Sequence, residues 1–269
     1  MPASVQNICR YIAFLSISFK YSSIKVYLNV VRLLHLQVGY GNPVSNHIIQ
    51  QVLKGVRRTL SHEPYRRPIM TTVLLKQIRS SLNLASSVDT AVWAACLLAF
   101  YGMLRISSLF PPHPNMLVVR SARIFKWGIL VSFKYSKTVQ YAERQPFVVL
   151  PWGKDQELCP VIAILASWRK SGVTKLDDPL LAIRVKDNIQ PLTRPIFHRS
   201  LTDTLDRLGL LGHGYSGHSF RRGGATHALN SGIPAEVIQA QGDWRSLAYL
   251  DYIDTSSPLS RVSHIQAMV

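Results

Sequence analysis

The most specific pattern in the chain lies near its end, where residues 217–253 read GHSFRRGGATHALNSGIPAEVIQAQGDWRSLAYLDYI. His218 and Arg221 form an H-x-x-R pair, which a helix would place on one face, one turn apart. Trp244 follows Arg221 by 23 residues, and Tyr252 follows Trp244 by eight. An isolated H-x-x-R pair is common on helix surfaces, so the information lies in the order of the four residues.

A fifth residue extends this order upstream. The most apolar segment contains YGMLRISSL, in which Arg105 stands where the apolar run stops. The order of Arg, H-x-x-R, Trp and Tyr resembles the tyrosine recombinase (phage integrase) superfamily. The stretches IKVYLNVVRLLH, AACLLAFYGMLRIS, LPWG followed by CPV, PLTR, YSGHSFRRGGAT and AYLDYI are similar to its eukaryotic transposon-encoded members, of the Crypton and DIRS kind.

The resemblance implies a site at which a tyrosine oxygen attacks a phosphodiester. Arg105 and Arg221 would hold the non-bridging oxygens by forked, charge-assisted hydrogen bonds. His218 would accept the tyrosine proton or donate to a phosphate oxygen. Trp244 would donate one hydrogen bond from its indole N–H, and Tyr252 would be the nucleophile.

Two roles have a second candidate. Tyr249 lies three residues before Tyr252, on the same face of an expected final helix, but the spacing from Trp244 and the Tyr-Ile ending favour Tyr252. In the superfamily, a lysine on a β-hairpin protonates the leaving 5′-oxygen. Lys137 in FKYSKTVQ matches the S-K-T pattern, and Lys134 is the alternative.

Two positions depart from the superfamily pattern. Ser108 stands three residues after Arg105, where many relatives carry an acid. Asp243 precedes Trp244, where the transposon relatives often have arginine. An acid that pointed into a phosphate pocket would oppose phosphate binding, so these positions leave open whether the chain still cuts DNA.

The charge of the chain indicates an anionic partner. Its 269 residues include 31 lysines and arginines against 14 aspartates and glutamates, for a formal net charge of +17. Residues 1–80 hold eleven of the basic residues and a single acid, Glu63. An almost purely basic segment fits a surface that meets a polyphosphate. We expect four arginines of this segment to contact DNA phosphates: Arg57, Arg58, Arg66 and Arg67.

The sequence predicts two domains. Three segments before residue 61 carry apolar residues at helical spacing, and HEPYRRP at residues 62–68 has the two prolines of a linker. Together with the resemblance, this predicts a helical core-binding DNA-binding domain over residues 1–64. Residues 65–269 would form the α+β catalytic domain of a tyrosine recombinase.

The expected fold class is mainly α with a small antiparallel β-sheet. Short β-like runs occur at residues 122–125, 129–133 and 147–150, and the polar stretch 134–145 would form a hairpin tip. Helices are expected in the second domain over residues 72–82, 88–109, 160–170, 194–208, 218–231 and 234–241.

Several other classes of protein do not fit. The longest apolar run has 14 residues, at 91–104, whereas a membrane-spanning helix needs about 20, so no membrane partner is expected. Three scattered cysteines suit a reducing compartment and are too few for a disulfide framework or a zinc cage. Walker, Rossmann, H-E-x-x-H and paired-cysteine patterns are absent from the sequence, so no metal or nucleotide cofactor is expected.

Together these features predict a site-specific recombinase or integrase that cuts and rejoins DNA through a 3′-phosphotyrosyl link. Such a link conserves the energy of the broken bond, so the reaction needs neither ATP nor metal. The resemblance implies double-stranded DNA as partner and a homo-tetramer on paired sites. The protein would be nuclear in a eukaryotic host and cytoplasmic otherwise. Two alternatives stay open: a transposon-derived DNA-binding protein without activity, and an enzyme like the type IB topoisomerases.

Overall fold

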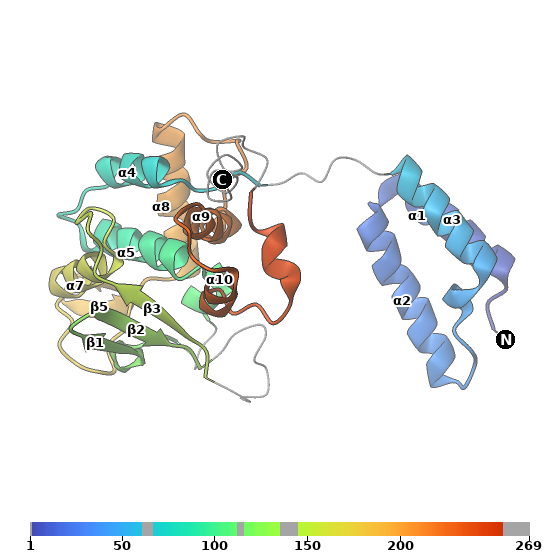
Figure 1. Ribbon diagram of the computed structural model, residues 1–269, viewed down its shortest axis with the longest axis horizontal. Helices are drawn as coiled ribbons and strands as arrows, with labels where there is room; N and C mark the ends of the chain where they lie inside the picture. Colours follow the sequence, from blue (N-terminus) through green and yellow to red (C-terminus); the bar gives the residue numbers. More distant parts are fainter. Residues whose placement is uncertain (1, 61–66, 112–115, 135–144, 255–269) are drawn as a thin grey trace. The chain divides into compact units, whose positions relative to one another are not determined.

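The computed structural model describes residues 2–60, 67–111, 116–134 and 145–254 (Figure 1). The chain divides into two compact units, Met1–Arg66 and Arg67–Val269. This division falls two residues after the expected boundary between residues 64 and 65. Each unit is built around a core of its own, so each is described separately.

The first unit is a set of three helices, α1 (Val5–Ser18), α2 (Tyr21–Gln37) and α3 (His47–Thr59), with a short 3₁₀ turn, η1 (Pro43–Ser45), before α3. Ser4 caps α1, where its side chain accepts a hydrogen bond from a backbone N–H of the first turn. The apolar residues at helical spacing face inward, as the sequence predicted. The core consists of Ile8, Ile12, Leu15, Ile24, Leu28, Ile49 and Leu53.

The second unit is centred on α5 (Ser87–Tyr101), which is buried from Thr90 through Phe100. The sequence predicted one helix over 88–109, and this was wrong. The backbone of Met103 turns left-handed, with φ of 47°, and a short helix, α6 (Ile106–Leu109), follows. Because of this turn, Arg105 is not on a continuous helix but occupies the N-cap position of α6.

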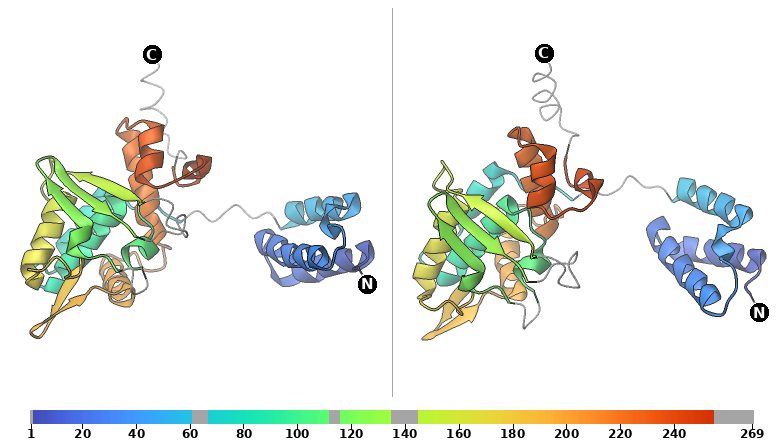
Figure 2. Two further views of the ribbon diagram at one scale, coloured as in Figure 1. Left: turned by 90° about the horizontal axis from the view of Figure 1, so that it is seen from below. Right: turned by 60° about the horizontal axis from the view of Figure 1, so that its bottom comes forward.

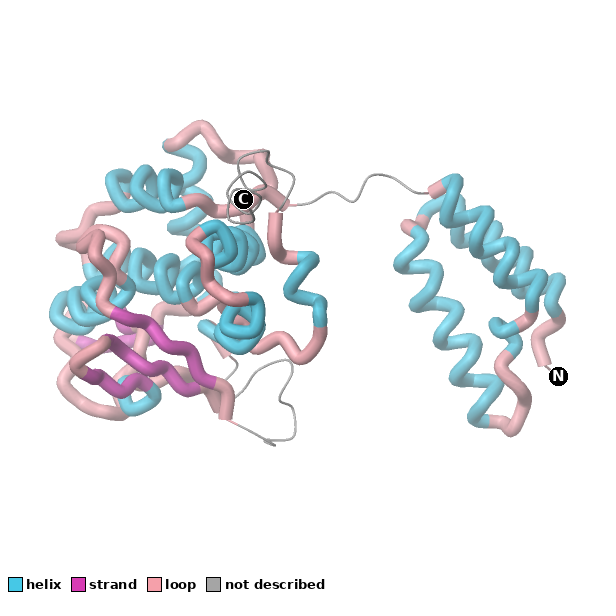
Figure 3. The backbone as a smooth tube through the Cα atoms, in the orientation of Figure 1, coloured by secondary structure: helices cyan, strands magenta, loops and turns pink. Residues whose placement is uncertain are grey.

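A three-stranded antiparallel sheet packs in the same unit, in the order β1 (Ala122–Phe125), β2 (Gly128–Ser132) and β3 (Phe147–Pro151). Side chains along β3 alternate, with Val148 and Leu150 buried and their neighbours exposed. The three short strands match the three predicted ones. In Figure 3 these strands lie at one side of the unit, and α4 (Thr72–Ser81) lies at the other.

A second, two-stranded hairpin was not predicted from the sequence. It pairs β4 (Ala182–Val185) with β5 (Asn188–Pro191), and Lys186 takes a left-handed conformation at the turn. The remaining described elements of this unit are 3₁₀ turns and helices: η2 (Val119–Ser121), α7 (Pro160–Ser171), α8 (Arg194–Arg207), α9 (Gly217–Asn230), α10 (Ala235–Gln241) and η3 (Leu247–Asp251).

The helix that carries the H-x-x-R pair, α9, is held very closely by its neighbours. It packs against α5 and α10, and Figure 2 shows α9 and α10 side by side. A Cβ on Gly223 would lie 1.9 Å from the carbonyl oxygen of Met70, and one on Gly224 would lie 2.0 Å from that of Phe100. Only glycine fits such an approach, so the RRGG sequence fixes α9 against the backbone of α5 and of the segment before α4.

Candidate functional site

An open cavity of about 590 Å³ brings several predicted site residues together. It lies among α6, α8, the start of α9 and the residue that follows η3. Among the described residues, its walls carry basic and aromatic groups and no acid. Those with functional side chains are Arg67, Arg105, Arg194, His198, Tyr215, His218 and Tyr252.

Arg105 is half-buried and connects this cavity to a second, much smaller one. The smaller cavity measures about 20 Å³ and is shared by Arg105, Ser108, Arg221 and Asp243. The two arginines of the predicted phosphate clamp are therefore neighbours, although they are 116 positions apart in the sequence. The turn at Met103 produces this arrangement, because a continuous helix would carry Arg105 onward along α5.

Arg221 is buried to an unusual degree, with 2 % of its surface exposed. Its guanidinium donates hydrogen bonds to the carbonyl oxygens of Met103 and of Gly242, the latter at 2.7 Å. Burial, together with the positive charge of Arg105, lowers the pKa of Arg221 to about 9. The group remains cationic at neutral pH, and so keeps a full positive charge inside the protein.

Trp244 packs on this guanidinium. Its ring centroid lies 3.8 Å from the central carbon of Arg221, a close cation–π contact, and 5.2 Å from the centroid of the Tyr252 ring. Within this stack, two buried N–H groups, Nε of Arg221 and Nε1 of Trp244, have no hydrogen-bond partner among the described residues. Buried donors are normally satisfied, so this pair is suited to an anionic oxygen that arrives with a ligand.

The two candidate tyrosines occupy different surroundings. Tyr252 lines the large cavity, and its ring lies 6.5 Å from that of His218 and nearly parallel to it. Tyr249 is 7 % exposed and packs against Trp244 and Ile253 in a small apolar cluster. Their segment forms a short 3₁₀ helix, η3, that ends just before Tyr252, and both rings contact Trp244, at centroid distances of 6.3 Å for Tyr249 and 5.2 Å for Tyr252.

His218 is exposed in the first turn of α9, and a capping box fixes the start of that helix. Ser216 and Ser219 form the box, each side chain accepting from a backbone N–H of the other. Arg67 donates a hydrogen bond to Ser216 at 2.5 Å, and Arg222 donates to the carbonyl oxygen of Arg67. Arg67, predicted as a DNA contact, therefore lies in the cavity and is tied to the helix that carries His218.

Comparison with known proteins agrees with this architecture. No family model matches the sequence. The curated "Integrase/recombinase xerD homolog" of Selenomonas ruminantium is 24 % identical over 250 residues, which cover 90 % of this chain and 70 % of the relative.

Solved structures resemble the chain over nearly its whole length. A Tn1549 transposon integrase in complex with transposon right end DNA has a TM-score of 0.64 at 12 % identity, over 99 % of this chain and 85 % of that one. The XerA recombinase has a TM-score of 0.55 at 16 % identity, over 97 % and 90 %. The chain has the fold of the tyrosine recombinase superfamily.

The predicted fold class, mainly α with a small antiparallel sheet, is thus confirmed as that of a tyrosine recombinase. Two predicted residues of the recombinase site, Lys137 and Arg66, lie outside the described residues. Lys134, the alternative general acid, is exposed just beyond the end of β2. Arg57 and Arg58 are exposed in the last turn of α3, in the first unit.

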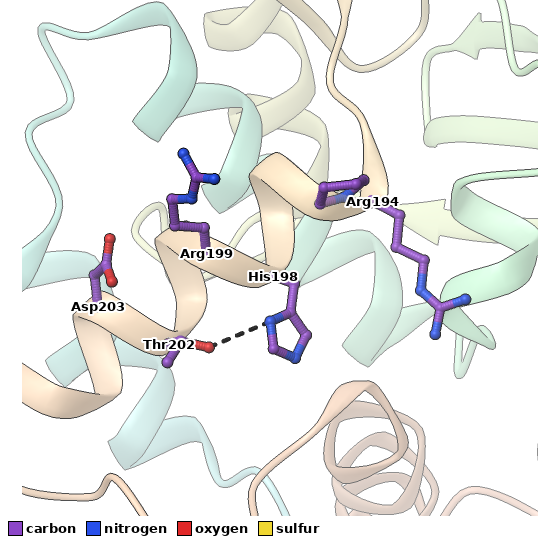
Figure 4. Close-up of a pocket in the computed structure, with 6 residues that line it drawn as sticks. Arg194, His198, Arg199, Thr202 and Asp203 are labelled. Atoms are coloured by element: carbon purple, nitrogen blue, oxygen red, sulfur yellow. Dashed lines mark hydrogen bonds between the residues drawn. The ribbon is translucent and has the colours of Figure 1, made fainter.

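The structure adds basic residues on α8 that sequence reasoning missed. A shallow cavity of about 510 Å³ runs along this helix, and Figure 4 shows Arg194 and Arg199 pointing away from each other there. His198 lies between them and is 3.4 Å from the hydroxyl of Thr202. Arg194 and His198 also line the large cavity. Their spacing of four residues, which gives a helix a shared face, was the signal in the sequence.

In the described part of the chain, no group of three or more His, Cys, Asp or Glu side chains could hold a metal ion. None of its helices is long and apolar enough to cross a membrane.

Proposed function

We propose that this chain is a site-specific DNA recombinase or integrase in which Tyr252 forms a covalent link to a 3′-phosphate. The observation that carries the proposal is one constellation drawn from three separate segments of the chain. Its members combine a nucleophile, two guanidiniums, an imidazole and an indole N–H: Tyr252, Arg105, Arg221, His218 and Trp244.

In the proposed reaction, the hydroxyl oxygen of Tyr252 attacks the scissile phosphorus. A new bond joins that oxygen to phosphorus, and the bond from phosphorus to the 5′-oxygen breaks. His218 takes the proton from the tyrosine. A lysine of the hairpin that follows β2, Lys137 or Lys134, returns a proton to the leaving 5′-oxygen. The reverse reaction, with a 5′-hydroxyl of another strand, rejoins the DNA without ATP.

Electrostatics around Tyr252 support this assignment. The central guanidinium carbon of Arg221 lies 4.9 Å from the Tyr252 ring centroid, and Arg105 lines the same cavity. These two positive charges beside the nucleophile stabilise the negative charge that builds on the phosphate oxygens in the transition state.

The unpartnered donors support a phosphate as the ligand. Arg221 Nε and Trp244 Nε1 are both buried and both lack a hydrogen-bond acceptor among the described residues. A tetrahedral anion supplies several acceptor oxygens, and a guanidinium matches two of them with its planar fork.

The proposal includes partners and cellular context. Double-stranded DNA is the substrate, and the chain would work as a homo-tetramer on paired sites, in the nucleus of a eukaryotic host or otherwise in the cytoplasm. Among the structurally similar proteins is an XerH recombinase bound to a palindromic difH substrate, with a TM-score of 0.60 at 12 % identity over 98 % of this chain and 73 % of that one. The Crypton-like and DIRS-like sequence segments support an origin in a transposable element.

The proposed function is tested with a duplex nicked just 3′ of the scissile phosphate, taken from the ends of the element that encodes the chain. The short 5′-hydroxyl fragment diffuses away, which prevents reversal, and a covalent protein–DNA adduct accumulates in the presence of EDTA. Tight binding without an adduct would favour the alternative of an inactive DNA-binding protein. Relaxation of supercoiled plasmid without regard to sequence would favour a topoisomerase.

A further inference from the structure

The tripeptide Gly242–Asp243–Trp244 lies against the buried guanidinium of Arg221. The carbonyl oxygen of Gly242 accepts one of its hydrogen bonds, and the Trp244 ring covers it at 3.8 Å. The turn is so tight that a Cβ on Gly242 would lie 1.6 Å from the indole ring. Asp243, between the two, is held in a left-handed conformation with φ of 54°.

Asp243 lines the small cavity at the centre of the site. That cavity has a volume of about 20 Å³, room for roughly one water molecule, so charges on its walls are separated by little solvent. Arg105, Arg221 and Ser108 form other parts of its wall. Asp243 is the one acid among the described residues that line either this cavity or the large one.

Arg105 and Arg221 line the same small cavity, so their positive charges repel each other unless a negative charge offsets the repulsion. A buried charge costs several kcal/mol unless it is paired, and a second like charge beside it adds repulsion. Neighbouring groups act on Arg221 in opposite directions: Arg105 lowers its pKa, whereas Tyr252 and, to a smaller extent, Asp243 raise it. The carboxylate therefore stabilises the charged form that phosphate binding requires.

We propose that Asp243 is a positioning residue, whose carboxylate offsets the repulsion between Arg105 and Arg221 and holds the Arg221 guanidinium against Trp244 in the geometry that receives the scissile phosphate. The inference rests on the proposed function for the identity of that ligand. A negative charge at this place also opposes the phosphate. Asp243 should therefore reduce DNA affinity slightly while it increases the rate of cleavage, a combination that a merely structural residue would not produce.

The coupling between Asp243 and Arg221 is testable without DNA, by thermal unfolding of the full chain. Asn preserves the shape of Asp and tolerates a positive φ, so Asp243→Asn removes mainly the charge. We expect it to lower the Tm by about 3 °C, and by less than 1 °C when Arg221 has been replaced by Met. The wild type, the two single variants and the double variant form a double-mutant cycle. If the Tm changes of the single variants simply add in the double variant, the proposal is overturned, whether or not the chain is a recombinase.

Cleavage of the nicked duplex provides the second test. Asp243→Asn should bind the duplex as tightly as the wild type or up to about threefold more tightly. It should form the adduct about tenfold to a hundredfold more slowly at saturating DNA. Cleavage at the wild-type rate by the Asn variant, while the wild type itself forms the adduct, would overturn the proposal but leave the proposed function standing.

A carboxylate introduced elsewhere on the cavity wall tests the role of the negative charge even if Asp243→Asn folds poorly. Ser108 is buried and lines the same cavity, so Ser108→Asp returns a negative charge to another part of its wall. Combined with Asp243→Asn, it should recover at least a tenth of the wild-type cleavage rate. Ser108→Asn in the same background is the matched neutral control and should recover none. Equal rates for the two double variants would contradict a role for the charge.

Discussion

Two sets of arginines occupy contrasting environments in this molecule. Arg221 is 2 % exposed in the second unit, with its hydrogen bonds, ring contacts and neighbouring charges fixed by the fold. Arg57 and Arg58 are exposed at the end of α3 in the first unit, and Arg194 and Arg199 are exposed on α8. All carry the same charge, and the buried one is held by two backbone carbonyl oxygens and the Trp244 ring. We infer that the buried arginine acts in the reaction itself, whereas the exposed arginines contribute to DNA affinity.

The largest effect should come from the buried arginine. Arg221→Lys keeps the charge but loses the planar fork, the contact with two carbonyl oxygens and the face that stacks on Trp244. We expect adduct formation to fall by roughly 10²–10³, with duplex affinity changed less than threefold. Rate and affinity are measured on the same nicked duplex, by gel shift and by covalent trapping. Near-normal cleavage by the lysine variant would remove Arg221 from the reactive site.

A smaller effect is expected when the exposed arginines of the first unit are neutralised. Arg57→Ala with Arg58→Ala should weaken binding to all duplex sequences, because these side chains would contact phosphates and not bases. The slope of log Kd against log salt should fall by up to about 1.8, at roughly 0.9 per lost contact. Titrations at several salt concentrations measure this slope.

The matched control removes two arginines of the second unit that form ion pairs with acidic side chains. Arg79 pairs with Glu157 at 2.8 Å, and Arg120 pairs with Asp177. Replacing both with Ala changes the net charge as much as the first pair does. It should leave the salt slope nearly unchanged. Equal slopes for the two double variants would mean that net charge, and not the end of α3, governs binding.

The smallest effect concerns α8. Arg194 lines both the large cavity and the shallow one, whereas Arg199 lines only the shallow one. Arg194→Ala should therefore weaken duplex binding about three- to tenfold, and Arg199→Ala less than twofold. Equal losses, measured by fluorescence anisotropy on one duplex, would place the edge of the DNA-binding surface beyond Arg199.

Patterns that depend on local sequence were predicted well. The helices of the first unit and the strands near residues 122–150 follow from apolar spacing, which the core of each unit reproduces. The order of Arg105, His218, Arg221 and Trp244 identified residues that the structure brings to one place. These predictions succeeded because the spacing of apolar residues and the order of the site residues can be read directly from the sequence.

Features set by tertiary contact were not predicted. The apolar run continues past Tyr101, so nothing local marked the end of α5, yet the left-handed backbone of Met103 ends it and brings Arg105 back toward α9. Tyr249 and Tyr252 both contact Trp244, but only the tertiary packing shows that the first is buried and that the second lines the cavity. Asp243 was regarded as a departure from the pattern, and only the cavity shows its neighbours.

The most direct measurement asks which tyrosine becomes attached to DNA. Tyr252→Phe and Tyr249→Phe each remove one oxygen, and they are compared on the same nicked duplex without metal or ATP. Protease digestion and mass spectrometry of the wild-type adduct locate the modified residue. The account predicts that Tyr252→Phe abolishes the adduct with binding intact, that Tyr249→Phe still forms it, and that the wild-type phosphotyrosine is at position 252. Loss of the adduct in Tyr249→Phe, with the modified peptide carrying Tyr249, would contradict it.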